Sequence, residues 1–157
     1  MRTYAYGFPR LGKNREFKKI TESLWKKEIS EDEFKKALSE LEANILSTYE
    51  KFVDKYPVGE VTKYDKMLDI ACMLGIYKVK NLDEYYQLCR GKNALELTMW
   101  FNTNYHYLVP DFSRIKDDFL FKEVNFEEIK KYKKGIPYLI GLFTFLKLAK
   151  EMRNVFS

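Results

Sequence analysis

The chain has 157 residues, of which 46% are hydrophobic and 17% aromatic, so it is long enough and apolar enough to bury the core of one domain. Its net charge of +5 comes from 28 basic and 23 acidic residues that are mixed along the chain. Such a mixture is unlike the clustered basic surface of a dedicated nucleic-acid binder, and it is compatible with an anionic ligand. We therefore predict one globular domain over residues 1–157 and no nucleic-acid partner.

The two cysteines, Cys72 and Cys89, are too few for a disulfide framework, and each lies in an apolar helical context. We expect free, buried thiols in a reducing compartment. The sequence shows neither an N-terminal signal peptide nor an apolar run of membrane-spanning length. The predicted location is therefore cytoplasmic, without a membrane partner.

The first third of the chain predicts one strand followed by an antiparallel helical hairpin. Residues 3–9 are typical of a strand that ends in a turn at Gly7 and Pro9. Asn14 can cap a helix that runs through Trp25, with Phe17, Ile20 or Thr21, and Leu24 on its buried face. The capping box Ser30–Glu33 then begins a long amphipathic helix that continues to about Lys55.

Two shorter helices are predicted in the middle of the chain. Thr62 is placed to cap a helix through Leu74, and Asn81 to cap a second helix that ends at Gly91. Asp65 and Asp69 lie four residues apart in the first of these helices. By themselves they are more typical of a solvated helix face than of an acid–base pair.

A central strand follows, and it leads into a polar and aromatic run. Apolar residues alternate with Glu96, Thr98 and Trp100 at the period of a strand: Leu95, Leu97, Met99 and Phe101. Residues 102–107 then offer amide, hydroxyl and imidazole groups, including Asn104 and His106. Such a run directly after a strand suits a ligand pocket. His106 fits two interpretations equally, a donor that faces the ligand or a packed structural histidine.

The last third predicts further alternation of helix and strand. Residues 111–124 are of mixed character and predict mostly loop with room for short structured stretches. Asn125 caps a helix to Lys134, residues 136–142 form a buried strand, and Thr144 caps a helix over residues 145–156. This order favours parallel βα units. The basic run 130–134 is interpreted as a solvated helix end. A weaker alternative is a nucleic-acid contact there, which would show steep salt dependence.

Several of these segments resemble the N-terminal domain of cobalamin-independent methionine synthase. Residues 96–110, ELTMWFNTNYHYLVP, are similar to the family pattern E-M-T-K-W-F-D-T-N-Y-H-Y-x-V-P. In the same order along the chain, residues 7–12 with 15–18 resemble G-x-P-R-x-G and R-E-L-K, residues 64–69 resemble Y-D-H-x-L-D, and residues 137–146 resemble P-V-L-x-G-P-x-T-F-L. The resemblance covers nearly the whole chain.

The resemblance implies the fold and a substrate. The family's N-terminal domain is a (β/α)8 barrel, and this chain supplies about four strands, so we expect a helix-rich partial barrel, about half of one, with a long N-terminal helical hairpin. Folate binding is implied as well, because the family's R-E-L-K segment and the lysine of its long motif help to hold the polyglutamate tail of 5-methyltetrahydrofolate. Carried over, the substrate-binding residues are Arg15, Glu16, Phe17 and Lys18, with Met99 at the lysine position and Asn104 and His106 nearby.

Methionine formation needs more than these residues. In the family, the zinc and homocysteine ligands belong to the C-terminal half, and Cys72, Cys89 and His106 lack the spacing of a zinc site. We predict no catalytic residue, metal or cofactor in this chain, and zinc only in a separate C-terminal half. Two hypotheses remain: a folate-polyglutamate-binding part of a methionine synthase that is inactive alone, or a non-catalytic interaction or oligomerisation protein derived from that domain. The partner would be a catalytic half or a second copy.

Overall fold

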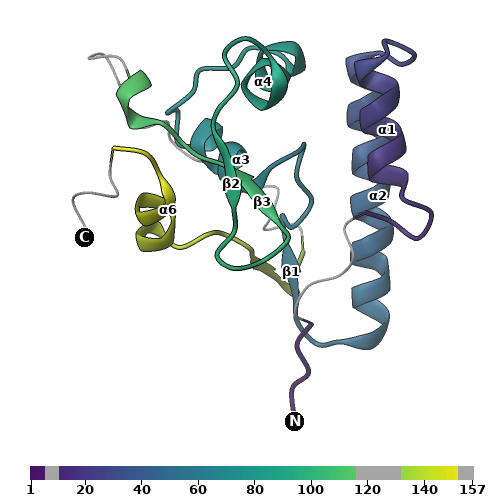
Figure 1. Cartoon of the computed structure of the whole chain (residues 1–157). Helices are drawn as coiled ribbons and strands as arrows, with labels where there is room; N and C mark the ends of the chain where they lie inside the picture. The colour runs from purple at the N-terminus through teal and green to yellow at the C-terminus, as the bar shows by residue number, and fades with distance from the viewer. Residues whose placement is uncertain (6–10, 116–131, 152–157) are drawn as a thin grey trace. The chain divides into compact units, whose positions relative to one another are not determined.

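A computed structural model describes residues 1–5, 11–115 and 132–151 of the chain (Figure 1). These residues divide into two compact units, one made of residues 1–61 and 132–138 and the other of residues 62–115 and 139–151. Both helices and short strands occur, so the fold is mixed α/β. Within the described ranges, no helix is long and apolar enough to cross a membrane.

The first unit is built on a helical hairpin. Helix α1 (Glu16–Trp25) packs against the longer α2 (Glu31–Phe52). The predicted capping box is confirmed, since the Ser30 hydroxyl accepts the Glu33 N–H and the Glu33 carboxylate accepts the Ser30 N–H. This reciprocal cap satisfies two backbone donors that the helix itself leaves free.

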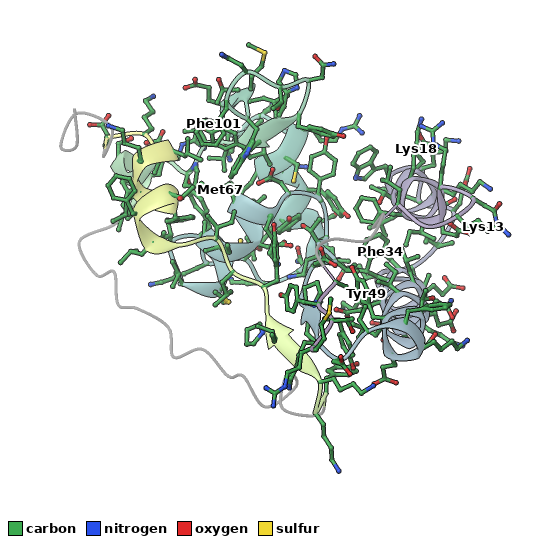
Figure 2. All side chains as sticks on the ribbon, turned by 90° about the horizontal axis from the view of Figure 1, so that it is seen from below. Lys13, Lys18, Phe34, Tyr49, Met67 and Phe101 are labelled. Carbon is green, nitrogen blue, oxygen red and sulfur yellow. The ribbon has the colours of Figure 1, made fainter. Side chains whose placement is uncertain are left out.

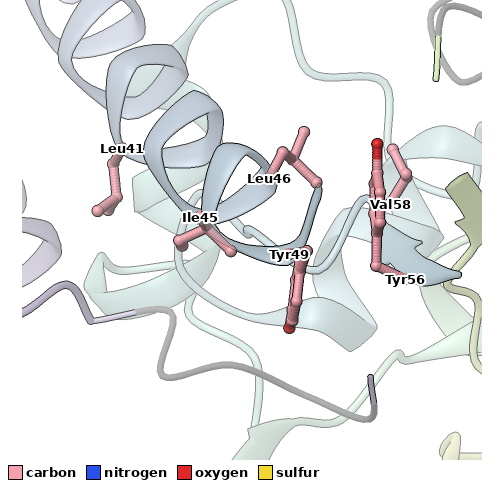
Figure 3. Packing of buried hydrophobic residues seen from close by; sticks show 6 residues of the cluster. All are labelled: Leu41, Ile45, Leu46, Tyr49, Tyr56 and Val58. Atoms are coloured by element: carbon pink, nitrogen blue, oxygen red, sulfur yellow. The ribbon is translucent and has the colours of Figure 1, made fainter. Parts of the chain in front are cut away.

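The core of this unit lies between α2 and strand β1 (Tyr56–Val58). Six buried side chains form it: Leu41, Ile45, Leu46, Tyr49, Tyr56 and Val58 (Figure 3). The rings of Tyr49 and Tyr56 stack with centroids 5.7 Å apart. Strand β1 pairs in parallel with β4 (Gly135–Pro137), and Tyr4 makes an isolated parallel bridge to Lys55. A side chain at Gly135 would lie 2.5 Å from the Val58 side chain, so the pairing requires glycine there.

The second unit combines helices with a β-hairpin. Its elements in chain order are α3 (Lys66–Met73), α4 (Leu82–Arg90), β2 (Leu97–Met99), β3 (His106–Leu108), the short helix η1 (Phe112–Arg114) and α6 (Leu142–Leu148). Strands β2 and β3 are antiparallel. Asp111 makes an isolated parallel bridge to Lys150.

Several predicted elements are confirmed. The helical hairpin is present, and Asn81 caps α4, which ends at its C-cap residue Gly91. The predicted parallel pairing occurs between β1 and β4. The described residues form two separate two-stranded sheets, so they do not make a closed barrel. The rest of the partial-barrel prediction depends on residues outside these ranges.

Three predicted helix caps are wrong. Helix α1 begins at Glu16, and its N-cap residue is the left-handed Arg15 rather than Asn14, with no side-chain cap. Helix α3 is capped by Asp65, because the Thr62 hydroxyl is used by Asp69. Helix α6 begins after Gly141, three residues before the predicted cap Thr144.

Two predicted strands are also corrected. The partner of the central strand is the antiparallel β3, since a turn over residues 100–105 brings the chain straight back. The strand predicted over residues 136–142 is limited to β4, and Leu142 already belongs to α6. Residues 132–134 precede β4 as a turn rather than as a helix end. Residues 125–131 and 152–156 of the predicted helices lie outside the described ranges, as do residues 6–9 of the first strand.

Candidate functional site

Four predicted site residues lie in one short stretch at the start of α1. Arg15 has φ of 60°, in the left-handed region, and its N–H donates to the Gly12 carbonyl at 3.2 Å. The Phe17 N–H donates to the Leu11 carbonyl, also at 3.2 Å. Gly12 has φ of 77°, and a Cβ there would overlap the Glu16 carboxylate. Residues 11–17 are therefore held as a tight turn that only glycine permits at its first bend.

The charged side chains of this turn have different surroundings. Hydrogen bonds from its own N–H and from the Asn14 N–H, the latter at 2.9 Å, hold the pKa of the Glu16 carboxyl below its usual range. The Arg15 side chain is exposed and makes no ion pair with any described residue. Lys18 lies on the outer side of α1, where its ammonium is 3.4 Å from the Glu22 carboxylate (Figure 2). Phe17 instead packs against the core cluster, so its role is to anchor the turn.

The other predicted residues gather on the β2–β3 hairpin. Met99 is the last residue of β2 and lies opposite His106, the first residue of β3. Asn104 is exposed in the connecting turn, and His106 is exposed as well. The packed interpretation of His106 is therefore wrong, and its role as a donor that faces a ligand stays a prediction. In the turn, the Thr103 hydroxyl donates to the Trp100 carbonyl at 2.6 Å and accepts the Tyr105 N–H at 3.2 Å.

The hairpin presents apolar side chains to solvent. Leu97, Met99 and Phe101 alternate along it and are 59%, 56% and 62% exposed. The intervening Trp100 packs edge-on against Tyr107, with ring centroids 5.4 Å apart. The apolar residues that alternate in the sequence therefore share one face of the hairpin, and this face, which includes Met99, is exposed to solvent.

The structure brings the predicted residues together in two groups. Arg15 to Lys18 form one group in the first unit, and Met99, Asn104 and His106 form the second group in the other unit.

A network of acidic and phenolic groups was missed by the sequence interpretation. Asp69 accepts hydrogen bonds from the Tyr85 hydroxyl at 2.8 Å, the Thr62 hydroxyl at 2.5 Å and the Lys63 N–H at 3.2 Å. Asp65 accepts the Leu68 N–H at 2.9 Å and the Leu108 N–H at 3.3 Å. The two carboxylates therefore connect α3, α4 and β3 and do not form a solvated helix face. Spacing could have indicated the Asp65 cap, but not the contact with Tyr85.

Burial perturbs the acidity of this network. Loss of solvent raises the pKa of Asp65 to about 6, against the opposing effect of the Leu68 and Leu108 N–H groups. The same cause raises the pKa of the Cys72 thiol to about 12 and raises that of Cys89 further. Neither thiol forms a disulfide, as predicted, but both are half-buried rather than fully buried. The raised pKa values mean that neither thiol is activated as a nucleophile.

The metal-binding capacity of the described residues is limited. Within those ranges, no three side chains of His, Cys, Asp or Glu come together as a potential metal site. A thiolate ligand is also disfavoured, because burial keeps Cys72 and Cys89 protonated. The described residues therefore do not fit a zinc site, and no reaction step is assigned to a metal here.

Comparison with known proteins identifies the family. The family described as "Cobalamin-independent synthase, N-terminal domain" matches residues 2–157. The 5-methyltetrahydropteroyltriglutamate–homocysteine methyltransferase of Thermotoga petrophila is 41% identical over 160 residues, which cover 96% of this chain and 22% of that enzyme. Enzymes of the same name are 37% identical in Herpetosiphon aurantiacus and 36% identical in Bacillus cereus, with 94% and 96% of this chain covered.

These relatives are much longer than the present chain. In each of the three, the matched region is 22% of the relative's length. The regions of this chain that match the family and the Thermotoga petrophila enzyme include both groups of predicted site residues. The chain belongs to the cobalamin-independent methionine synthase family, and its match is to the N-terminal domain of that family.

Proposed function

We propose that this chain supplies the part of a cobalamin-independent methionine synthase that holds the polyglutamate tail of its folate substrate. The single observation that carries the proposal is the tight turn at the start of α1, which fixes Arg15 and leaves its side chain open. The relatives are named for a triglutamate substrate, and that tail carries several carboxylates. Arg15 is suited to such groups, because a guanidinium can donate two parallel hydrogen bonds to one carboxylate.

Two further features support anion binding at this turn. Lys18 lies one helical turn from the start of α1, and its pairing with Glu22 is exposed and therefore weak enough to exchange for a ligand carboxylate. The negative charge of Glu16 is directed back onto the Asn14 N–H within the turn. The positive end of the α1 dipole also favours an anion near this turn.

The β2–β3 hairpin carries the remaining predicted binding residues as a separate group. Asn104 can donate and accept hydrogen bonds, and His106 offers an exposed imidazole. Met99, at the position of the family's lysine, contributes no charge. We infer that tail binding by this chain depends on Arg15 and Lys18 more than it does in relatives that carry the lysine.

The rest of the reaction is assigned to other parts of the enzyme. We propose that the parallel pairings of β1 with β4 and of Tyr4 with Lys55 belong to the (β/α)8 barrel that the family resemblance implies. Zinc and homocysteine would be bound by a C-terminal catalytic half acting as partner. Methyl transfer would then require that half, and this chain alone would not make methionine.

Calorimetric titration tests the proposal. The chain is titrated with methyltetrahydropteroyl monoglutamate and with the triglutamate. We expect the triglutamate to bind at least tenfold more tightly, since added carboxylates can each contribute about 1 kcal/mol or more. Equal affinities, or no heat from folded protein with either ligand, would overturn the proposal.

A second candidate function is self-association through the hairpin. The open face of β2 carries Leu97, Met99 and Phe101, and in the described part of the chain β2 pairs only with β3. A second copy could cover this face through a two-fold contact. Sedimentation at micromolar concentration distinguishes the two cases, because a strictly monomeric chain would contradict this second candidate.

A further inference from the structure

A cavity of about 520 Å³ in the second unit lies outside all the residues predicted to bind folate. Three lysines line it, Lys63, Lys78 and Lys80, together with one acidic residue, Asp69. The remaining lining residues include Cys72, Met73 and Tyr77. Its volume falls within the range of small-molecule sites.

The segment with two of the lysines is fixed by the end of α3. Gly75 has φ of 84°, and this left-handed residue reverses the chain. The Gly75 N–H donates to the Cys72 carbonyl at 3.1 Å and the Ile76 N–H to the Ala71 carbonyl at 2.9 Å. Lys78 and Lys80 are thereby carried back toward the end of the helix. The Lys80 N–H then donates to the Glu84 carboxylate at 2.8 Å, which ties the segment to α4.

The third lysine comes from a separate stretch that is equally well anchored. The Lys63 N–H donates to Asp69 at 3.2 Å, and the Lys63 carbonyl accepts the Tyr86 hydroxyl at 2.9 Å. The Lys63 ammonium lies 5.5 Å from the centre of the Tyr85 ring. The backbone that carries each lysine is therefore held in place before any ligand arrives.

The described lining residues carry three lysines and one carboxylate, so their formal charge is positive. That carboxylate, Asp69, accepts hydrogen bonds from the Tyr85 hydroxyl, the Thr62 hydroxyl and the Lys63 N–H. In the described ranges, neither Lys63 nor Lys80 forms an ion pair with a carboxylate. An excess of positive charge around one cavity favours a ligand with two or more negative charges.

We propose that this cavity binds a compact polyanion, with two or more phosphate or carboxylate groups, between Lys63, Lys78 and Lys80. Ammonium groups on flexible stems can close on phosphate or carboxylate oxygens without a fixed bidentate geometry. The site is independent of Arg15 and Lys18, and its occupation does not depend on the proposed folate role.

Methionine methyl groups provide the readout. Met73 lines the cavity, whereas Met67, on the same helix, is buried and does not. The full chain is prepared with isotope-labelled methionine methyl groups, and the Met73 signal is assigned with the variant Met73→Leu. Pyrophosphate and tricarballylate are titrated in separate arms against potassium chloride at matched ionic strength. We expect the Met73 signal to move with saturation at a Kd of roughly 1 mM or tighter, while the Met67 signal stays in place.

Variants complete the test. Lys63→Gln, Lys78→Gln and Lys80→Gln combined should weaken binding at least tenfold, whereas the matched set Lys35→Gln, Lys36→Gln and Lys51→Gln on α2 should not. Lys78→Gln and Lys80→Gln are also measured singly, so that a folding defect of the triple variant does not decide the outcome. Tighter pyrophosphate identifies a phosphate ligand, and tighter tricarballylate a carboxylate ligand. No shift of Met73, an equal shift with potassium chloride, or equal weakening in the α2 set would overturn the proposal.

Discussion

Met99 lies directly opposite His106 in the antiparallel pair of β2 and β3. Two residues that the sequence separates by a polar turn are therefore neighbours on one ladder. Side chains at such opposed positions are close enough to contact the same ligand. The family's lysine at the Met99 position would place an ammonium next to the exposed imidazole, so one substitution can test whether this face contributes to tail binding.

Met99→Lys should tighten binding of the triglutamate by about twofold to fivefold, because an exposed cation gains up to about 1 kcal/mol from a nearby carboxylate. Met99 is 56% exposed, so the longer side chain fits without displacing the core. The monoglutamate should gain less. Calorimetry on both ligands measures the difference.

Leu97→Lys is the matched control for that variant. Leu97 lies two residues earlier on the same open face and is 59% exposed, so the added charge and exposure are the same. Two residues along a strand displace the ammonium by about 7 Å. Equal tightening in the two variants would mean that net charge alone is responsible.

Tyr85→Phe should lower the free energy of unfolding by about 1.5–3 kcal/mol, because Asp69 loses a hydrogen bond to a charged acceptor in a partly buried setting. Urea denaturation measures the change. Tyr105→Phe is the control, since this exposed hydroxyl should shift the unfolding free energy by about 0.5 kcal/mol at most. A Tyr85→Phe variant as stable as the wild type would contradict the structural role of the acidic network.

Asp65 should make the chain less stable as the pH rises from about 4 to about 6. Its pKa is raised from 3.8 to about 6 in the folded state, so over this interval the folded protein binds more protons than the unfolded chain. The loss in unfolding free energy due to this group is on the order of 2 kcal/mol. Asp65→Asn should flatten this part of the profile, and an unchanged slope would show that Asp65 titrates alike in both states.

Phe101→Asn tests the second candidate function. Phe101 has φ of 51° and is 62% exposed, and asparagine tolerates this left-handed conformation better than most residues. If the hairpin mediates self-association, the variant should dissociate at concentrations where the wild type is dimeric, while its thermal midpoint at low concentration stays the same. Sedimentation velocity reads the association directly. Identical association in both proteins would exclude this face.

The sequence predicted features that depend on neighbouring residues better than features that depend on contacts between distant residues. The capping box at Ser30 and the cap at Asn81 are local patterns, and both were found correctly. The predicted cap at Asn14 is wrong because the left-handed Arg15 comes between it and the helix, and the cap at Thr62 is wrong because its hydroxyl donates to Asp69 while Asp65 accepts the Leu68 N–H. Local rules carry no information about which competing partner is closer.

The candidate site shows the same division. The pairing of Met99 with His106 depends on a turn whose geometry no spacing rule predicted, and the Asp69–Tyr85 contact joins two helices. The left-handed Arg15 likewise follows from the bend at Gly12 rather than from its own preference. Family resemblance supplied the candidate residues, while tertiary structure determined their exposure and neighbours.

Calorimetric titration of the double variant Arg15→Ala and Lys18→Ala with the triglutamate tests the central claim most directly. The matched control is Lys35→Ala with Lys36→Ala, which removes the same charge from exposed positions on α2. We expect the α1 variant to lose at least tenfold in affinity and the control to bind like the wild type. Equal affinities in the three proteins would contradict a tail-binding site at the start of α1.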